Sequence, residues 1–140
     1  MVGDPIADMI TRIKNASCAG KDSIVISFSK IKNEIANVLK DEGYLKSVDV
    51  IGKDKLPYLR KLELGIAYFD KAALSSENRK PRVQDVKRMS KLSRRTYITK
   101  NELAANNSRG VSVLSTTSGI LTGKMAKQKG LGGELLFKIW

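Results

Sequence analysis

Histidine is absent from this chain, and cysteine occurs once, at Cys18. Without histidine, neither a Ser-His-Asp triad nor a histidine metal site can form. A single cysteine allows no disulfide within the chain and no cysteine-based zinc cluster. A glycine-rich phosphate loop with its lysine is also missing, so nucleotide hydrolysis has no support. These gaps predict a protein without enzymatic activity, bound metal or cofactor.

Long apolar runs and acidic residues are also scarce. No apolar stretch reaches the roughly 18 residues that span a membrane, and the N-terminus lacks the order of a signal peptide. We therefore expect no membrane partner and a cytoplasmic location. The 14 Asp and Glu residues face 26 Lys and Arg, for a formal net charge of +12. This surplus favours a polyanionic partner, nucleic acid before an anionic membrane. A basic surface that serves only solubility is the plainer alternative.

Capping residues and apolar spacing predict the elements of the first half. Asp4-Pro5 is typical of a helix start, because Asp caps free backbone N–H groups and Pro suits the first turn. Ser29 precedes a second helical pattern, which Gly43 ends. The expected elements are helices at 4–17 and 29–43, and strands at 24–28, 45–51 and 59–68. This α-β-α-β-β order is enough for a small two-layer unit.

The second half reads as a mostly β unit behind a linker. Residues 71–82 are polar and contain a proline, as linkers often do. The expected elements are strands at 83–89, 96–98, 111–114, 120–121 and 134–140, and short helices at 100–107 and 122–130. We therefore predict an α+β fold of two small α/β units, with an N-terminal unit at 1–70, the linker at 71–82 and a C-terminal unit at 83–140.

Basic side chains are densest in residues 79–100, where Asp85 is the only acidic residue. Such a cluster neutralises phosphates and releases counterions, which makes binding depend on salt. We expect Arg88 to contact phosphate, Arg95 to fork to two oxygens or stack on a base, and Tyr97 to offer a ring. The alternative is a solvated loop that carries charge for solubility.

A run of hydroxyl side chains, Ser115-Thr116-Thr117-Ser118, leads into Gly119 between two apolar stretches. Compact hydroxyls fit the shallow minor groove of RNA, where they can meet 2′-OH groups, base edges and phosphates. Equally, they can bond their own backbone in an ordinary hairpin. On residue types alone, the two interpretations are even.

The run Gly132-Gly133-Glu134 is a weaker signal. Glycine allows a close backbone approach or a positive φ. A carboxylate among so many cations can simply form an ion pair, and acceptance of a hydrogen bond from a base amino group is the functional alternative.

Four runs of the chain, in order, resemble the motifs of one family. Asp4 to Ala16 resembles the opening D-P-I-A-D-M-L-T-R-I-R-N-A, and residues 29–44 contain runs similar to the second helix. Ser115 to Gly119 resembles the loop S-T-S-x-G, and Gly130 to Glu134 the ending G-x-G-G-E. The chain thus resembles, almost from end to end, the small-subunit ribosomal protein family conventionally counted eighth, in its bacterial form.

The resemblance implies an RNA-binding structural protein of the ribosome. Its partners would be the central domain of small-subunit ribosomal RNA, bound early in assembly, and neighbouring small-subunit proteins. The C-terminal unit would grip a minor groove through the hydroxyl loop, and the N-terminal unit would touch a neighbouring helix. The RNA-binding residues expected from pattern and resemblance together are Thr11, Arg12, Asn15, Lys30, Lys32, Arg88, Arg95, Tyr97, Ser115, Thr116, Thr117, Gly119, Gly132, Gly133 and Glu134.

The chain departs from the family pattern in three places. Thr117 keeps the hydroxyl of the third loop position but adds a branched methyl, and Leu92-Ser93 stands where the family has Pro-Gly. The linker is longer than usual. Two rival functions stay open: a regulator that binds messenger RNA, including its own, and an RNA-modifying enzyme, for which no nucleophile–base pair appears. An organelle ribosome is a further open location.

Overall fold

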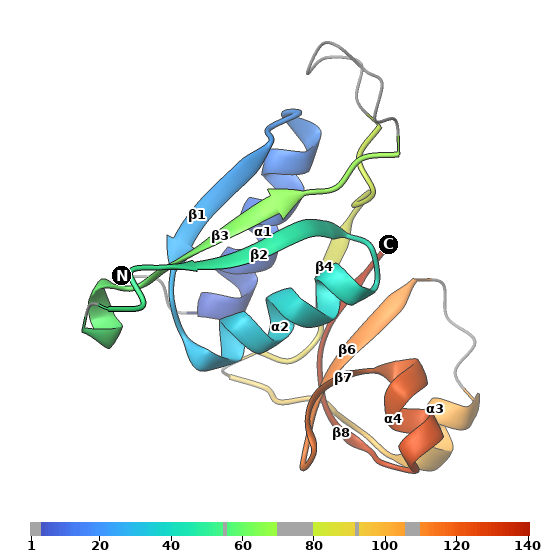
Figure 1. The fold of residues 1–140 in the computed structure, drawn as a ribbon. Coiled ribbons are helices and arrows are strands. Elements are labelled where there is room, and N and C mark those ends of the chain that lie inside the picture. Colours follow the sequence, from blue (N-terminus) through green and yellow to red (C-terminus); the bar gives the residue numbers. More distant parts are fainter. Residues whose placement is uncertain (1–3, 55, 70–79, 92, 106–109) are drawn as a thin grey trace.

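The computed structural model describes residues 4–54, 56–69, 80–91, 93–105 and 110–140. Its elements follow in the order α1 (Pro5–Cys18), β1 (Ser23–Ser27), α2 (Lys30–Asp41), β2 (Leu45–Ile51), the 3₁₀ helix η1 (Pro57–Leu59), β3 (Lys61–Ile66), β4 (Val86–Arg88), β5 (Tyr97–Ile98), α3 (Lys100–Ala105), β6 (Val111–Thr116), β7 (Gly119–Thr122), α4 (Gly123–Lys129) and β8 (Gly133–Ile139) (Figure 1). Mixed helices and antiparallel sheets confirm the α+β prediction.

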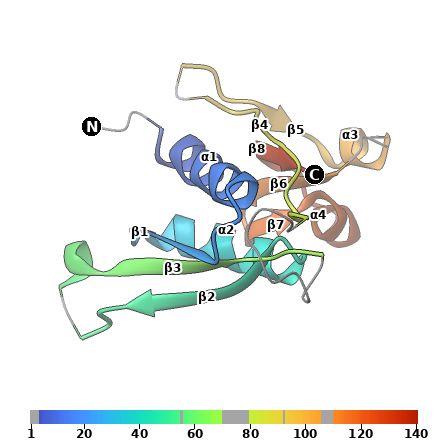
Figure 2. The same cartoon turned by 90° about the horizontal axis from the view of Figure 1, so that it is seen from above.

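The N-terminal unit has two layers. Its three antiparallel strands lie in the order β1-β3-β2, and both helices lie on one side of this sheet (Figure 2). The central strand β3 turns Leu62, Leu64 and Ile66 toward the helices, and all three are buried. The opposite face of the sheet has no helix of the N-terminal unit over it.

Helix α1 forms as its sequence predicts. The Asp4 carboxylate accepts a hydrogen bond from the Ala7 N–H at 3.2 Å, and Pro5 occupies the first turn. Its apolar face is buried and consists of Ile6, Met9, Ile10 and Ile13. Ser29 caps α2 in the same way, by accepting from the Lys32 N–H at 3.2 Å.

The C-terminal unit is a mostly antiparallel sheet with two short helices. Its strands lie in the order β4-β8-β6-β7, and β5 also pairs with β8. A small core between this sheet and the helices contains the buried residues Leu103, Leu114, Leu121, Ala126 and Leu135. The long strand β8 therefore holds three other strands in place.

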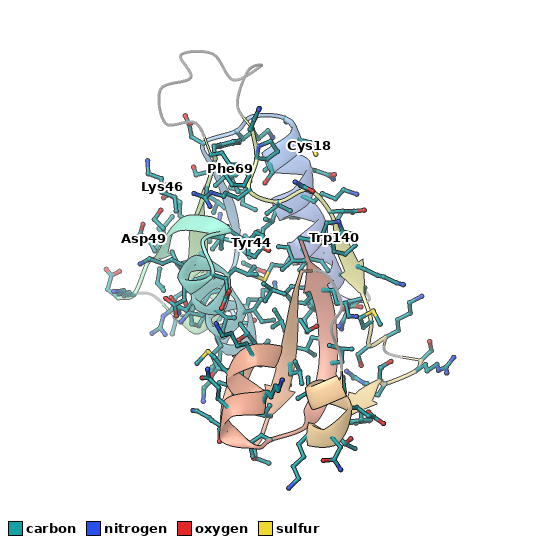
Figure 3. The ribbon with its side chains drawn as sticks, turned by 90° about the vertical axis from the view of Figure 1, so that its right-hand side faces the viewer. Cys18, Tyr44, Lys46, Asp49, Phe69 and Trp140 are labelled. Carbon is teal, nitrogen blue, oxygen red and sulfur yellow. The ribbon has the colours of Figure 1, made fainter. Side chains whose placement is uncertain are left out.

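The two units share one hydrophobic core. This core contains Ile35 and Leu39 from α2 together with Val113, Phe137 and Ile139 from the C-terminal sheet. Figure 3 shows Tyr44 and Trp140 in the region where the units meet, and the Tyr44 hydroxyl lies 3.5 Å from the Ile139 carbonyl oxygen. The predicted unit boundaries stay a prediction, and most of the predicted linker, residues 71–79, lies outside the described residues.

Three predicted strands are shorter in the structure, the one at 96–98 by a single residue. Leu59 belongs to η1, so β3 begins only at Lys61. The strand expected at 83–89 covers only Val86–Arg88, because the N–H groups of Gln84 and Asp85 both donate to the Trp140 carbonyl. Two donors on one acceptor break the regular ladder of hydrogen bonds before β4 begins.

Candidate nucleic-acid interface

Three strands of the C-terminal sheet bring distant predicted residues into one row. Glu134 on β8 lies directly opposite Tyr97 on β5 and, on its other side, directly opposite Ser115 on β6. Residues directly opposite in antiparallel strands point to the same face. Tyr97 is 69% exposed, so its ring is available to a partner. The row therefore offers an aromatic ring, a carboxylate and a hydroxyl side by side.

The two glycines before Glu134 let the neighbouring backbones approach closely. A Cβ atom on Gly133 would collide with the Ser115 carbonyl oxygen, and one on Gly132 would come within 2.5 Å of the Ile98 carbonyl oxygen. Any larger residue would push the hydroxyl hairpin or β5 away from β8. The predicted run Gly132-Gly133-Glu134 thus sets the spacing of the row.

The hairpin between β6 and β7 divides its hydroxyls between two uses. The Thr116 hydroxyl donates to the Gly119 carbonyl at 2.9 Å and accepts from the Ser118 N–H at 3.2 Å. Gly119 has a φ of 104°, which favours glycine. Within the described chain, the hydroxyls of Ser115 and Thr117 form no hydrogen bond, so these two are available to a partner.

Glu134 is held by two side chains from the segment before β5. Its Oε1 accepts from the Ser90 hydroxyl at 2.7 Å and from Arg95 at 3.0 Å. Ser90 is fully buried, and its oxygen also accepts from the Thr96 N–H at 3.1 Å. Sequence reasoning missed the part played by Ser90, because it lies 44 residues from Glu134 and no local pattern marks it.

This network controls the charge of Glu134. Burial alone would raise the pKa of Glu134, but hydrogen bonds from Ser90 and Arg95 and the positive charge of Arg95 and Arg88 bring it below its ordinary value. The side chain is therefore a carboxylate at neutral pH, with Oε1 already occupied by protein donors.

The Glu134 network should make the free energy of unfolding depend on pH in the acidic range. A lowered pKa in the folded chain means that the carboxylate stabilises the fold above its ordinary pKa, and that this stabilisation is lost as the pH falls through the folded-state pKa. Between about pH 5 and pH 3 we expect the free energy of unfolding to fall more steeply for the wild type than for Glu134→Gln. Urea denaturation across this range measures both; parallel curves would contradict the assignment.

Arg88 lies inside the protein rather than on this row. Its guanidinium donates to both carboxylate oxygens of Asp4, at 3.0 and 3.4 Å, and also to the Leu136 carbonyl. The Arg88 side chain is only 10% exposed. It therefore offers RNA little surface, and we leave it out of the candidate interface.

The predicted residues of the N-terminal unit form a second, separate surface. Thr11, Arg12 and Asn15 are exposed on the polar face of α1. Arg12 lines two surface grooves between α1 and β1, of about 530 and 470 Å³. Four cations in all line these grooves: Arg12, Lys21, Lys32 and Lys61.

Two basic residues of this surface, Arg12 and Lys32, form contacts within the chain. Arg12 forms an ion pair with Asp8 at 3.1 Å, one turn earlier in α1, and the Lys32 ammonium donates to the Ser27 hydroxyl at 2.9 Å. Lys30 is exposed at the start of α2. The surface thus combines basic side chains with apolar groove-lining residues, among them Met9 and Ile26.

The described residues present groups that can contact nucleic acid. They contain no group of three His, Cys, Asp or Glu side chains that could hold a metal ion. No helix among them is long and apolar enough to cross a membrane. What they present is a ring, hydroxyls and cations over two faces, the groups that contact sugars, bases and phosphates.

The comparisons with known proteins all point to the same family. The family model described as "Ribosomal protein S8" matches residues 4–140. The chain is 39% identical over 140 residues to "Small ribosomal subunit protein uS8" of Dictyoglomus thermophilum, covering 99% of this chain and 98% of that protein. The protein of the same description from Halothermothrix orenii is 41% identical over 140 residues, covering 99% and 98%. The one from Geobacter metallireducens is 39% identical over 138 residues, covering 98% and 97%.

Proposed function

Since this chain belongs to the ribosomal protein S8 family, a family of structural and not enzymatic proteins of the small ribosomal subunit, we propose that it binds the central domain of small-subunit ribosomal RNA directly. Binding there would occur early and would help the subunit to assemble. The C-terminal row would supply selectivity, and the N-terminal surface would make a second contact.

The observation that carries this proposal is the row formed by Tyr97, Glu134 and Ser115. A wide, shallow RNA minor groove presents 2′-hydroxyls and base edges, which compact hydroxyls reach better than long side chains do. The close approach at Gly133 keeps the hairpin backbone beside β8, so the hydroxyls stand at a defined distance from the ring and the carboxylate. A fixed constellation of this kind selects one RNA shape.

The N-terminal surface would add affinity rather than selectivity. Its groove-lining cations attract phosphates of any sequence, and exposed Thr11 and Asn15 can bond to sugar or phosphate oxygens. With one surface on each unit, the shared hydrophobic core holds the two RNA contacts in a constant relation.

Binding should be selective and salt-dependent. We expect the chain to bind a transcript of the central domain more tightly than a scrambled transcript of equal length. Raising the salt from about 50 to 200 mM should weaken binding to both by about 30-fold or more if at least three phosphates are neutralised. Filter binding measures both affinities across the series. A flat salt response, or equal affinity for the two transcripts at every salt concentration, would contradict the proposal.

Recognition by shape extends to any RNA that folds in the same way. A segment of the chain's own messenger RNA with that shape would therefore compete for the same row, which would give the protein control over its own synthesis. Adding this messenger RNA as an unlabelled competitor in the same assay tests the point: a random competitor should displace the central-domain transcript only at much higher concentration.

A further inference from the structure

The outer face of the N-terminal sheet carries no helix of its unit, and its composition differs from that of the rest of the chain. The register places three rows of residues on this face, one across each level of the sheet. From one end to the other, the rows are Ser23, Gly65 and Ser47, then Val25, Glu63 and Asp49, then Ser27, Lys61 and Ile51. The face is therefore flat and small at one end, acidic in the middle and mixed at the other end.

Large apolar side chains are exposed on this face and at its end. On the face itself, Val25 is 46% and Ile51 is 41% exposed. The connection from β2 to β3 adds three more, namely Leu56 at 58%, Tyr58 at 78% and Leu59 at 50%. Large exposed apolar side chains with a polar surround are typical of protein–protein contact.

Two like charges lie side by side in the middle of the face. Asp49 and Glu63 are directly opposite each other on β2 and β3, an arrangement that destabilises a sheet when the charges are alike. Neither carboxylate forms an ion pair with any residue that the structure describes. Four other carboxylates of this basic chain do have a cation partner: Asp4, Asp8, Asp85 and Glu134.

These charges disfavour RNA as the occupant. Adjacent carboxylates repel phosphates, and among the nine residues of the three rows Lys61 is the one cation. Figure 3 labels Asp49 and Lys46 on the outer side of the N-terminal unit, away from the C-terminal sheet. The opposite holds for a basic protein segment, because a Lys or Arg placed between Asp49 and Glu63 would remove their repulsion while its apolar neighbours cover Val25 and Ile51.

We infer that this face docks a neighbouring protein of the small subunit, through a segment that carries Lys or Arg between apolar side chains. The inference rests on the chain's place in the ribosome and not on which RNA it binds. The two faces of the N-terminal unit would then have different partners, with RNA on the α1 side and protein on the sheet side.

Photo-crosslinking within assembled small subunits tests the occupant. Ile51 is replaced by a photoreactive phenylalanine analogue, the subunits are purified and irradiated, and the attached molecule is identified by mass spectrometry. We expect one peptide of a single small-subunit protein, with Lys or Arg among apolar residues. A crosslink to RNA, to a second copy of this chain, or to nothing would overturn the inference.

A charge reversal tests the role of the acidic pair. Asp49→Lys should fold at least as well as the wild type, because it converts the repulsion with Glu63 into an attraction. When Asp49→Lys is combined with the photoreactive residue, the crosslink yield in assembled subunits should fall about tenfold, because the partner's cation now faces a cation. Asp41→Lys, an equal charge change at an exposed position on α2, should stay within about twofold of the wild type.

RNA binding by the free chain separates this inference from the proposed function. Both variants should bind the central-domain transcript with an affinity within about twofold of the wild type. Equal crosslink yields for Asp49→Lys and Asp41→Lys would overturn the docking inference, whatever the RNA affinity shows.

Discussion

Replacing Arg88 by alanine should lower the free energy of unfolding by about 2–4 kcal/mol, because it leaves a largely buried carboxylate without its cation. Arg88 donates to both oxygens of Asp4 and to the Leu136 carbonyl. The side chains of Arg88 and Asp4 are only 10% and 23% exposed, so water replaces the lost donors poorly. Urea denaturation followed by circular dichroism measures the loss.

Lys87 provides the matched control for this prediction. It precedes Arg88 on β4 but is exposed, so Lys87→Ala should change the free energy of unfolding by no more than about 0.5 kcal/mol. Arg88→Lys should fall between the two, because an ammonium cannot donate in parallel to two carboxylate oxygens as a guanidinium does. An Arg88→Ala variant as stable as Lys87→Ala would show that the Asp4 pair contributes nothing.

The position of Arg88 explains why this cost should be large. Asp4 caps the first turn of α1, and Leu136 lies in the middle of β8, the strand that pairs with three others. One guanidinium therefore ties the start of the N-terminal unit to the centre of the C-terminal sheet. The two candidate RNA surfaces keep their relative position partly through this contact.

Elements that depend on near neighbours could be predicted from the sequence. Asp4, Ser29 and Thr122 each accept a hydrogen bond from the N–H three residues later, at 3.2 Å in every case. A cap needs only residues within one turn, so its pattern is readable in a short window. Gly130 ends α4 with a φ of 67°, again as its local pattern predicts.

Contacts between distant residues could not be predicted in this way. Arg88 lies 84 residues from Asp4, and Ser90 lies 44 residues from Glu134. The density of charge in residues 79–100 favours phosphate contacts over a solvated loop, but it does not separate Arg88, whose side chain is 10% exposed, from Tyr97, which is 69% exposed. The predicted limits of the strand at 83–89 were wrong for the same reason. The N–H groups of Gln84 and Asp85 share the carbonyl of Trp140, which is far away in the sequence.

The different contacts of the three hydroxyls in the hairpin could not be predicted from the sequence. Pattern and resemblance together named Ser115, Thr116 and Thr117 as equivalent hydroxyls that either read RNA or hold a turn. Only geometry separates them, because one chain of hydroxyls can do both. In the structure Thr116 holds the turn, and Ser115 and Thr117 form no hydrogen bond with described residues.

Ser115→Ala should therefore weaken binding to the central-domain transcript without affecting the fold. Losing the hydroxyl leaves an RNA group without a partner, which costs about 1–3 kcal/mol, or roughly 5- to 150-fold in affinity. Affinity for scrambled RNA and the melting temperature should hardly change, because this hydroxyl has no partner among the described residues. Filter binding with both transcripts and thermal unfolding give the three readouts.

Thr116→Val should give the complementary pattern. It removes the bonds to Gly119 and Ser118 while keeping the shape of the side chain, so we expect a loss of about 0.5–1.5 kcal/mol in the free energy of unfolding. Any loss of RNA affinity would then follow from a displaced hairpin and would also appear in Gly119→Ala, which strains the same turn at its positive φ. If Ser115→Ala instead lowered affinity for both transcripts equally, the hydroxyl would add only general affinity. Selectivity would then have to come from Tyr97 and Glu134, the remaining members of the row.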